Sequence, residues 1–295
     1  MLLNKFQGLG NKYCERYLWN TWDKEDLANN WWTALRFFLN HAFMRGRRDD
    51  LSEEYYRYTV LTLKERFEIP TKPDEKAFAN ITAINNCYDK RIIEQFKIDK
   101  NMSKNGNSIK HSDFRVEVAE NNELISCLQE KRKVIFDDIP GKRSKAIYLG
   151  NDRDLMMVLD VLKYIVEDKE RSNIYNHICN KLISSGVKAT HLELTQIYAI
   201  GDKIAAFLIR DIGLLNTNIK IDEYEYAFPV DTWVLKIAKK LGCETNDLKK
   251  VKGYFIEKCI ADHLDPLKVA AGLWYLGFNS LDIVLDKLEY INVND

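Results

Sequence analysis

The apolar residues of this chain recur with the spacing of α-helices over most of its length. Between residues 155 and 166, apolar side chains at 155, 158, 159, 162 and 166 form one stripe of a helix. The same periodicity predicts further helices over 27–43, 51–67, 76–96, 174–183, 192–198, 203–214, 232–241, 247–261 and 266–276. Strands do not alternate with helices as they do in chains that build a parallel sheet. The sequence therefore predicts a mostly α-helical fold.

The first half of the chain is less regular than the second. Residues 100–111 are rich in Asn, Ser and Lys, which is typical of an exposed loop. The apolar runs at 114–118 and 134–136 are too brief to assign as strands. We therefore expect an N-terminal helical region, 1–150, with a polar loop near 100–112, and a C-terminal region, 151–295. The N-terminal helices are expected to pack into both parts of the fold.

The composition narrows the class of protein. Apolar residues make up 46% of the 295 residues and charged residues 30%, which is ordinary for a globular chain. No window reaches the roughly 20 apolar residues that a bilayer-spanning helix needs, and the N-terminus lacks a secretory signal. The six cysteines are scattered without a Cys-x-x-Cys spacing, so we expect no metal centre and no cofactor. We expect a cytoplasmic monomer without a membrane partner, associated with the nucleoid if the source is prokaryotic.

The charges are balanced overall but clustered locally. The formal net charge is +0, which counts against a protein that binds nucleic acid. Basic residues nevertheless gather at 45–48, 131–133, 142–145 and 249–252. Each cluster alone is more often a solvated surface than a contact to phosphate.

Residues 194–209, LTQIYAIGDKIAAFLI, are the most informative segment. Two amphipathic stretches flank a short connection, in which Gly201 is predicted to permit a backbone conformation closed to other residues. The second helix is expected to begin near Asp202, whose carboxylate suits the positive helix N-terminus. Backbone N–H groups at that terminus can bind a DNA phosphate with little help from side chains. Taken alone, such a segment is more often an ordinary turn between packed helices.

A second motif follows at residues 228–234, FPVDTWV. Asp231 comes shortly after Pro229 and opens a predicted helix whose apolar positions are 234, 237, 238 and 241. Taken alone, Asp231 is most simply the N-cap of that helix.

Together, the two segments resemble the helix-hairpin-helix-GPD superfamily of DNA glycosylases. The matching residues are Gly201-Asp202-Lys203 and Val230-Asp231-Thr232-Trp233-Val234, followed by Leu241-Gly242. The resemblance is specific over about residues 192–242. It implies two helical lobes around a cleft, with a helix-hairpin-helix motif and damaged double-stranded DNA as the partner.

The sequence departs from the family pattern in two places. Tyr198-Ala199 stands where the family usually has Pro-Gly before the hairpin. The connection between the hairpin and the aspartate is also longer than in common members, and it contains Asp222, Glu223 and Glu225. Because carboxylates repel phosphates, we expect this acidic stretch to point away from DNA.

The resemblance implies a role for each residue of a catalytic pair. Lys203 would attack C1′ of the damaged nucleotide, form a Schiff base and promote strand cleavage by β-elimination. A lysine must be neutral to act as a nucleophile, and desolvation and a helix N-terminus both favour the neutral form. Asp231 would stay ionised, stabilise positive charge on the sugar and assist proton transfer.

Further candidates bind the base or the phosphates. Phe207 lies one helical turn after Lys203, so both side chains share a face and Phe207 can stack on an extruded base. The resemblance adds Trp274, Tyr275 and Asn40 as base-binding candidates, although the aromatic residues fit a core and Asn40 a helix cap equally well. The phosphate-binding candidates are Ala199, Ile200, Gly201, Arg47 and Lys250.

The branch of the superfamily follows by elimination. The chain has no C-terminal cysteine cluster, unlike the iron–sulfur branches, and it has a lysine where the alkyladenine-type branch has none. This favours the 8-oxoguanine DNA glycosylase/lyase branch. Two alternatives stay open: a non-catalytic helix-hairpin-helix DNA-binding protein, and a monofunctional glycosylase that uses Asp231 and water.

Overall fold

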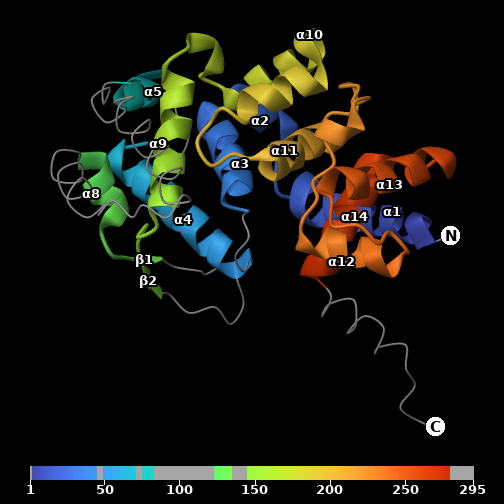
Figure 1. Cartoon of the computed structure of the whole chain (residues 1–295). Helices are drawn as coiled ribbons and strands as arrows, with labels where there is room; N and C mark the ends of the chain where they lie inside the picture. Colours follow the sequence, from blue (N-terminus) through green and yellow to red (C-terminus); the bar gives the residue numbers. More distant parts are fainter. Residues whose placement is uncertain (1, 45–48, 71–74, 83–122, 135–144, 280–295) are drawn as a thin grey trace, which may run out of the picture. The chain divides into compact units, whose positions relative to one another are not determined.

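The computed structural model describes residues 2–44, 49–70, 75–82, 123–134 and 145–279 (Figure 1). These residues are mostly α-helical, as the periodicity predicts. Contacts divide the chain into two compact units, each assembled from segments that are separate in sequence. The first unit consists of Met1–Lys24, Cys179–Leu192 and Gly201–Asp295, and the second of Glu25–Ile178 and Glu193–Ile200.

The second unit contains helices and one small hairpin of strands. Its elements are α2 (Lys24–Asn29, whose first residue belongs to the first unit), α3 (Trp31–Phe43), α4 (Asp49–Arg66), α5 (Glu75–Thr82), α8 (Glu123–Gln129), β1 (Arg132–Val134), β2 (Lys145–Ile147), α9 (Asp152–Val166) and the 3₁₀ turn η3 (Lys169–Arg171). Strands β1 and β2 pair antiparallel, with Lys133 opposite Ala146. The buried Tyr58 links α4 to the end of α8, because its hydroxyl lies 2.8 Å from the carbonyl oxygen of Leu128.

Several predicted elements of the first half change or lie outside the described residues. The helix predicted over 27–43 is divided into α2 and α3, because the Asn30 side chain accepts the N–H groups of Trp32 and Thr33 and caps α3. The polar loop at 100–112, the run at 114–118 and most of the helix predicted over 76–96 lie outside the described residues. The apolar run at 134–136, which was too brief to assign, begins at the last residue of β1, Val134.

The first unit is built around its N-terminal and C-terminal helices. Its elements are α1 (Leu2–Tyr13), the π-helical turn η1 (Cys14–Trp19), α11 (Asp202–Leu215), the 3₁₀ turn η4 (Tyr224–Tyr226), α12 (Thr232–Lys240), α13 (Leu248–Ala261) and α14 (Pro266–Phe278). Figure 1 shows α1, α12, α13 and α14 close together, and α1 and α14 make the most extensive contact between elements of the described residues. Apolar side chains from α1, α12, α13 and α14 form one buried cluster.

Two glycines permit the close approach of α1 and α14. A Cβ atom on Gly10 would lie 2.0 Å from the carbonyl oxygen of Lys268, and one on Gly272 would lie 1.8 Å from the carbonyl oxygen of Phe6. Both distances are far below van der Waals contact, so any larger residue would force the helices apart. This contact fixes the helix that carries Trp274.

Helix α10 (Ile174–Leu194) precedes α11 and contains the helix predicted over 174–183. The helix predicted over 192–198 is mostly wrong, because only residues 192–194 belong to α10 and residues 195–199 form turns. It is interrupted at Gly186, where φ is 85° and ψ is 174°. The Glu223 carboxylate accepts the backbone N–H of Lys188 at 2.9 Å and so caps the second half of α10. Within the described ranges, no helix is both long enough and apolar enough to span a membrane.

Candidate functional site

The first turn of α11 positions Lys203. The helix begins after Gly201, which has no side chain to cap it. Every residue from 204 to 215 is buried, so the half-buried Lys203 stands where the core meets the surface. Helix α11 therefore holds this lysine on a rigid element, as a reacting group requires.

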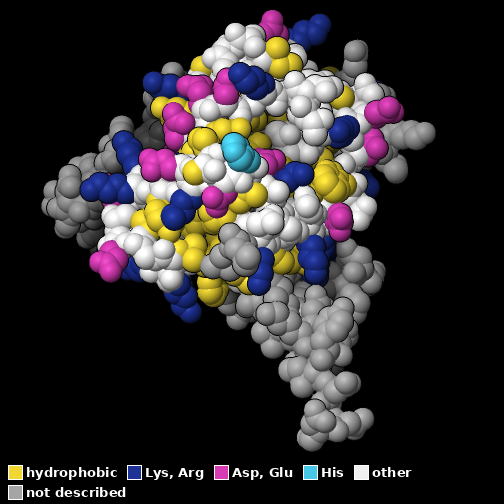
Figure 2. Space-filling model, turned by 90° about the vertical axis from the view of Figure 1, so that its right-hand side faces the viewer, with side chains coloured by type: hydrophobic (Ala, Val, Ile, Leu, Met, Phe, Trp, Pro, Cys, Tyr) yellow, Lys and Arg dark blue, Asp and Glu magenta, His cyan; other side chains and the backbone are white. Residues whose placement is uncertain are grey.

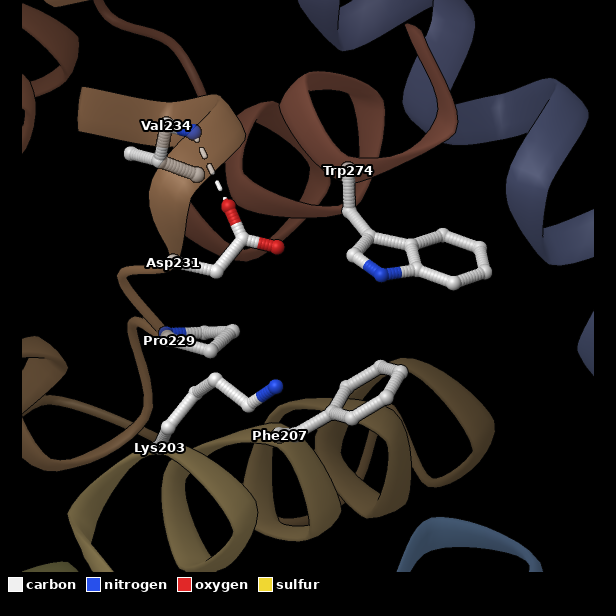
Figure 3. Close-up of a pocket in the computed structure, with 6 residues that line it drawn as sticks. All are labelled: Lys203, Phe207, Pro229, Asp231, Val234 and Trp274. Atoms are coloured by element: carbon white, nitrogen blue, oxygen red, sulfur yellow. Dashed lines mark hydrogen bonds between the residues drawn. The ribbon is translucent and has the colours of Figure 1, made fainter. Parts of the chain in front are cut away.

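Asp231 is the N-cap of α12, as its sequence context predicts. Its Oδ1 atom accepts the backbone N–H groups of Trp233 and Val234, each at 2.9 Å. These two hydrogen bonds fix the orientation of the carboxylate. Figure 3 shows that the second carboxylate oxygen is turned toward Trp274 and the interior of a pocket.

The two candidate catalytic residues line the same pocket. It is lined by Lys203, Phe207, Pro229, Asp231, Val234 and Trp274. In Figure 3 the Lys203 amine enters the pocket between Asp231 and Phe207. Two polar groups thus converge in a wall that is otherwise apolar, which is the usual composition of a small-molecule site.

The aromatic residues of the pocket form a continuous layer. The rings of Phe207 and Trp274 have centroids 5.8 Å apart and an interplanar angle of 40°. Trp274 also stacks on Phe278, with centroids 4.8 Å apart and an angle of 14°. Because Phe207 and Trp274 contact each other, they do not frame an open slot in this structure. A planar group between them would require one of the rings to move.

A buried charge pair lies behind Phe207. The Arg210 guanidinium is 4.4 Å from the centroid of Phe207 and 4.7 Å from that of Tyr13. It forms a fully buried ion pair with Asp211 at 2.7 Å, and the Tyr13 hydroxyl donates a hydrogen bond to the same carboxylate. Burial, followed by the Asp211 charge, raises the pKa of Tyr13 well above its ordinary value. The sequence reasoning missed this cluster, although two charges inside the apolar run LIRDIGLL were a signal.

The remaining base-binding candidates do not line the pocket. Tyr275 is buried and makes an edge contact with Tyr17, their centroids being 6.2 Å apart. Asn40 lies in the last turn of α3 in the second unit, and Met44, not Asn40, is the C-cap of that helix.

The phosphate-binding candidates lie in the connection before α11 and in α13. Lys250 is exposed in the first turn of α13, and Arg47 lies outside the described residues. The side chain of Ile200 is buried, so only its backbone can contact a ligand.

The expectation that Gly201 has a backbone conformation closed to other residues is wrong. Gly201 has φ −97° and ψ −179°, an extended conformation that other residues adopt freely, so its conformation does not require glycine. The left-handed position is Ala199, with φ 63°. A Cβ atom on Gly201 would meet nothing within 4 Å. The space in front of Gly201 is therefore open, as it is at Gly8 and Gly242.

The acidic connection between α11 and α12 is tied to the unit by specific contacts. Glu223 caps the second half of α10, and the carbonyl oxygen of Glu225 accepts a hydrogen bond of 2.7 Å from Lys252 of α13. The pair of Asp222 and Lys220, 3.0 Å apart, lies within the connection itself. In the part of the chain that the structure describes, no three His, Cys, Asp or Glu residues gather as a metal site.

The pocket combines the Lys203 amine of α11 with the Asp231 carboxylate that caps α12, and its other lining side chains are aromatic or aliphatic. Comparison with known proteins found no matching family model, no matching curated sequence and no matching solved structure. A functional assignment therefore depends on the residues themselves.

Proposed function

We propose that this protein is a base-excision repair enzyme, a DNA glycosylase with abasic-site lyase activity. We further propose that it removes an oxidised base, with 8-oxoguanine favoured by the sequence resemblance. One observation carries the proposal: Lys203 and Asp231, which come from separate helices, line one pocket with Phe207 and Trp274. A lysine amine can attack C1′ of the sugar, and an aspartate carboxylate can stabilise the positive charge that develops there.

The proposed reaction begins with the neutral Lys203 amine. Its lone pair forms a bond to C1′, the glycosidic bond breaks, and the base leaves with the bonding electrons and takes up a proton. The Asp231 carboxylate stabilises the positive charge that develops on the sugar as this bond breaks. Apolar walls strengthen this interaction because they exclude water and lower the local dielectric constant.

The lyase step follows from the same bond. The lone pair of the secondary amine then forms a C=N bond to C1′ as the C1′–O4′ bond breaks, O4′ takes up a proton from solvent, and the product is a protonated Schiff base with Lys203. The Schiff base makes the hydrogen on C2′ acidic, and its removal expels the 3′ phosphate by β-elimination. Hydrolysis of the imine then returns the lysine. The proposed reaction uses no metal or organic cofactor.

The DNA backbone would approach the N-terminus of α11. Gly201 supplies no side-chain cap and leaves open space in front of its Cα, so a phosphate can reach the backbone N–H groups of the first turn. Figure 2 shows lysine and arginine side chains interspersed with acidic ones on the face that it presents. This mixed charge favours a local backbone contact over a broad electrostatic surface.

Borohydride trapping tests the proposal. The protein is incubated with duplex DNA that contains 8-oxoguanine or an abasic site, and a covalent adduct is sought for wild type, Lys203→Gln and Asp231→Asn. We expect an adduct in wild type, none in Lys203→Gln and much less in Asp231→Asn. Lys258→Gln is the matched control, because it removes an exposed lysine of α13 that is not in the pocket. The absence of an adduct on either DNA would contradict the Schiff-base mechanism.

A second candidate is a helix-hairpin-helix DNA-binding protein without catalysis. The observation that favours it is that the N-cap role already accounts for Asp231. Lys203 would then contact phosphate, and Lys203→Ala would reduce the salt dependence of binding by about one unit of slope. A monofunctional glycosylase would instead release the base, give no adduct and tolerate Lys203→Gln.

A further inference from the structure

Helix α12 presents a basic face to solvent. Its exposed side chains are those of Thr232, Trp233, Lys236, Lys239 and Lys240. The last three are called the α12 lysines below. No acidic residue occurs between positions 232 and 243, so no neighbour along this stretch of the chain offsets their positive charge. Such a face attracts a polyanion.

Trp233 is a large aromatic side chain held at this surface, where it is 43% exposed. A Cβ atom on Gly277 of α14 would lie 2.6 Å from Cγ of the indole ring, so the ring packs directly on the backbone of α14. The Lys236 ammonium group lies 4.6 Å from the ring centroid. The contact with α14 limits the movement of the indole, whereas the exposed Lys236 side chain can leave the ring.

The indole lies at the edge of the pocket. Trp274 lines the pocket, and Gly277 is its neighbour on the surface of α14, because residues three apart on a helix share a face. Asp231 also lines the pocket, and its carboxylate accepts the backbone N–H of Trp233. A strand of nucleic acid with one nucleotide at the pocket would therefore also reach α12.

An aromatic ring among lysines is suited to an unpaired nucleotide. Every base has a π face that can stack on an aromatic ring, and lysines bind the phosphates of the same strand. Base stacking is stronger than an exposed cation–π contact, so a base can displace Lys236 from the indole. The displaced ammonium group can then contact phosphate. In duplex DNA the faces of the bases are covered by their stacked neighbours, so a single strand is the better ligand.

We propose that the exposed face of α12 is a binding site for single-stranded DNA, in which an unpaired base stacks on Trp233 and the α12 lysines contact the phosphates. The inference goes beyond the proposed function, because it requires neither the Lys203 amine nor a damaged base.

Fluorescence anisotropy tests the inference, with a labelled oligothymidine and a labelled duplex of the same length as probes. Trp233→Ala should weaken the binding of oligothymidine by about tenfold, because one stacked base is lost, and should leave duplex affinity nearly unchanged. Trp233→Phe keeps a ring and should retain most of the affinity. Trp19→Ala is the matched control, because Trp19 is 46% exposed on η1, and it should bind oligothymidine as wild type does.

The salt dependence of binding separates the ring from the lysines. Lys236→Gln should reduce the slope of log affinity against log salt concentration by about 0.7, because one phosphate contact is lost. Trp233→Ala should keep the wild-type slope, because the indole has no charge. Lys258→Gln is the matched control, since Lys258 lies 4.9 Å from the ring centroid of Tyr254 on α13 and not on α12. It should keep the wild-type slope and affinity.

Three results would overturn the inference: no binding of oligothymidine by wild type, wild-type affinity in Trp233→Ala, or an equal loss of affinity for both probes in that variant. The last would mean that α12 binds the phosphates of either form without stacking. Borohydride trapping by wild type would still support the proposed function in each case. Conversely, oligothymidine binding that depends on Trp233, without any trapping, would contradict the enzyme and support this site. If Trp233→Ala does not fold, Trp233→Leu takes its place with the same expected and contradicting results.

Discussion

Ala199 is held in a backbone conformation that favours glycine. Its φ of 63° lies in the left-handed region, which costs an L side chain about 1–2 kcal/mol. Ala199→Gly should raise the free energy of unfolding by about 0.5–1 kcal/mol, because the relief of strain exceeds the extra entropy that glycine gains in the unfolded chain. Urea denaturation of the two proteins measures this difference. A less stable variant would show that the alanine methyl group makes contacts that outweigh the strain.

Gly201 provides the opposite case, because its conformation is ordinary and the space around it is open. Gly201→Ala should change the free energy of unfolding by less than about 1 kcal/mol. If a phosphate binds the backbone at this position, the added methyl group stands in its way, and affinity for duplex DNA should fall several-fold in a fluorescence-anisotropy titration. Gly253→Ala, in α13, is the control for a harmless methyl group. If Gly201→Ala binds duplex DNA with unchanged affinity, the DNA phosphate does not contact the backbone at this position.

At the residue scale, the sequence predicted the pocket better than its surroundings. Lys203, Phe207 and Asp231 come from the two local motifs and Trp274 from the resemblance alone, and these four residues line one pocket. The Lys252 contact to Asp202 joins residues that no local motif relates. A signal for its burial did exist, because position 252 shares the buried stripe of α13 with positions 255 and 259. Charge alone groups residues 249–252 into one basic cluster and does not show that Lys252 is buried.

At the scale of an element, Asp231 has two separable roles. As the N-cap of α12 it accepts two backbone N–H groups, and asparagine can accept them equally well. Asp231→Ala should therefore lower the free energy of unfolding by about 1 kcal/mol, whereas Asp231→Asn should leave it nearly unchanged. Both should lose most of the trapping activity. Thermal unfolding and trapping, measured on the same preparations, check the two expectations.

Asp247→Ala is the matched control for this pair, because Asp247 caps α13 in the same way and does not line the pocket. It should lose a similar amount of stability and retain trapping. If Asp231→Asn is as active as wild type, the carboxylate serves only as a cap.

Helix boundaries were predictable where caps and periodicity agree. Helix α13 begins after Asp247 and α12 after Asp231, both within a residue of the predicted start. The prediction of helix boundaries failed where a single side chain or backbone angle ends or bends a helix. Asn30 divides one expected helix into two. Gly186, with its positive φ, kinks α10. Apolar spacing contains no information about either event.

At the scale of the whole molecule, the first unit packs an early helix, α1, against a late one, α14. Helix α1, to which the sequence analysis assigned no role, packs against α14 through Gly10 and Gly272. The first unit also takes in Cys179–Leu192 from the middle of the chain. A reading along the sequence divides a chain into contiguous regions, so it does not predict a unit assembled from distant segments.

This packing buries two thiols whose ionisation should limit stability at high pH. Cys14 and Cys259 are fully buried in the first unit, and burial raises the pKa of each to about 12 from an ordinary value of 9.0. The unfolded chain therefore releases these protons at lower pH than the folded chain does. The stability that each protonated thiol contributes is fully present below pH 9.0 and is lost as pH rises toward about 12.

The loss should reach about 1.4 kcal/mol for each thiol at about pH 10. Urea denaturation of wild type, Cys14→Ala and Cys259→Ala between neutral pH and about pH 10 measures it. Each variant starts from a lower stability, because it leaves a small cavity, but its stability should fall less steeply with pH. Cys127→Ala, at a half-buried position, is the control and should keep the wild-type slope. Equal slopes in all four proteins would mean that the buried thiols ionise in the folded state as readily as in the unfolded chain.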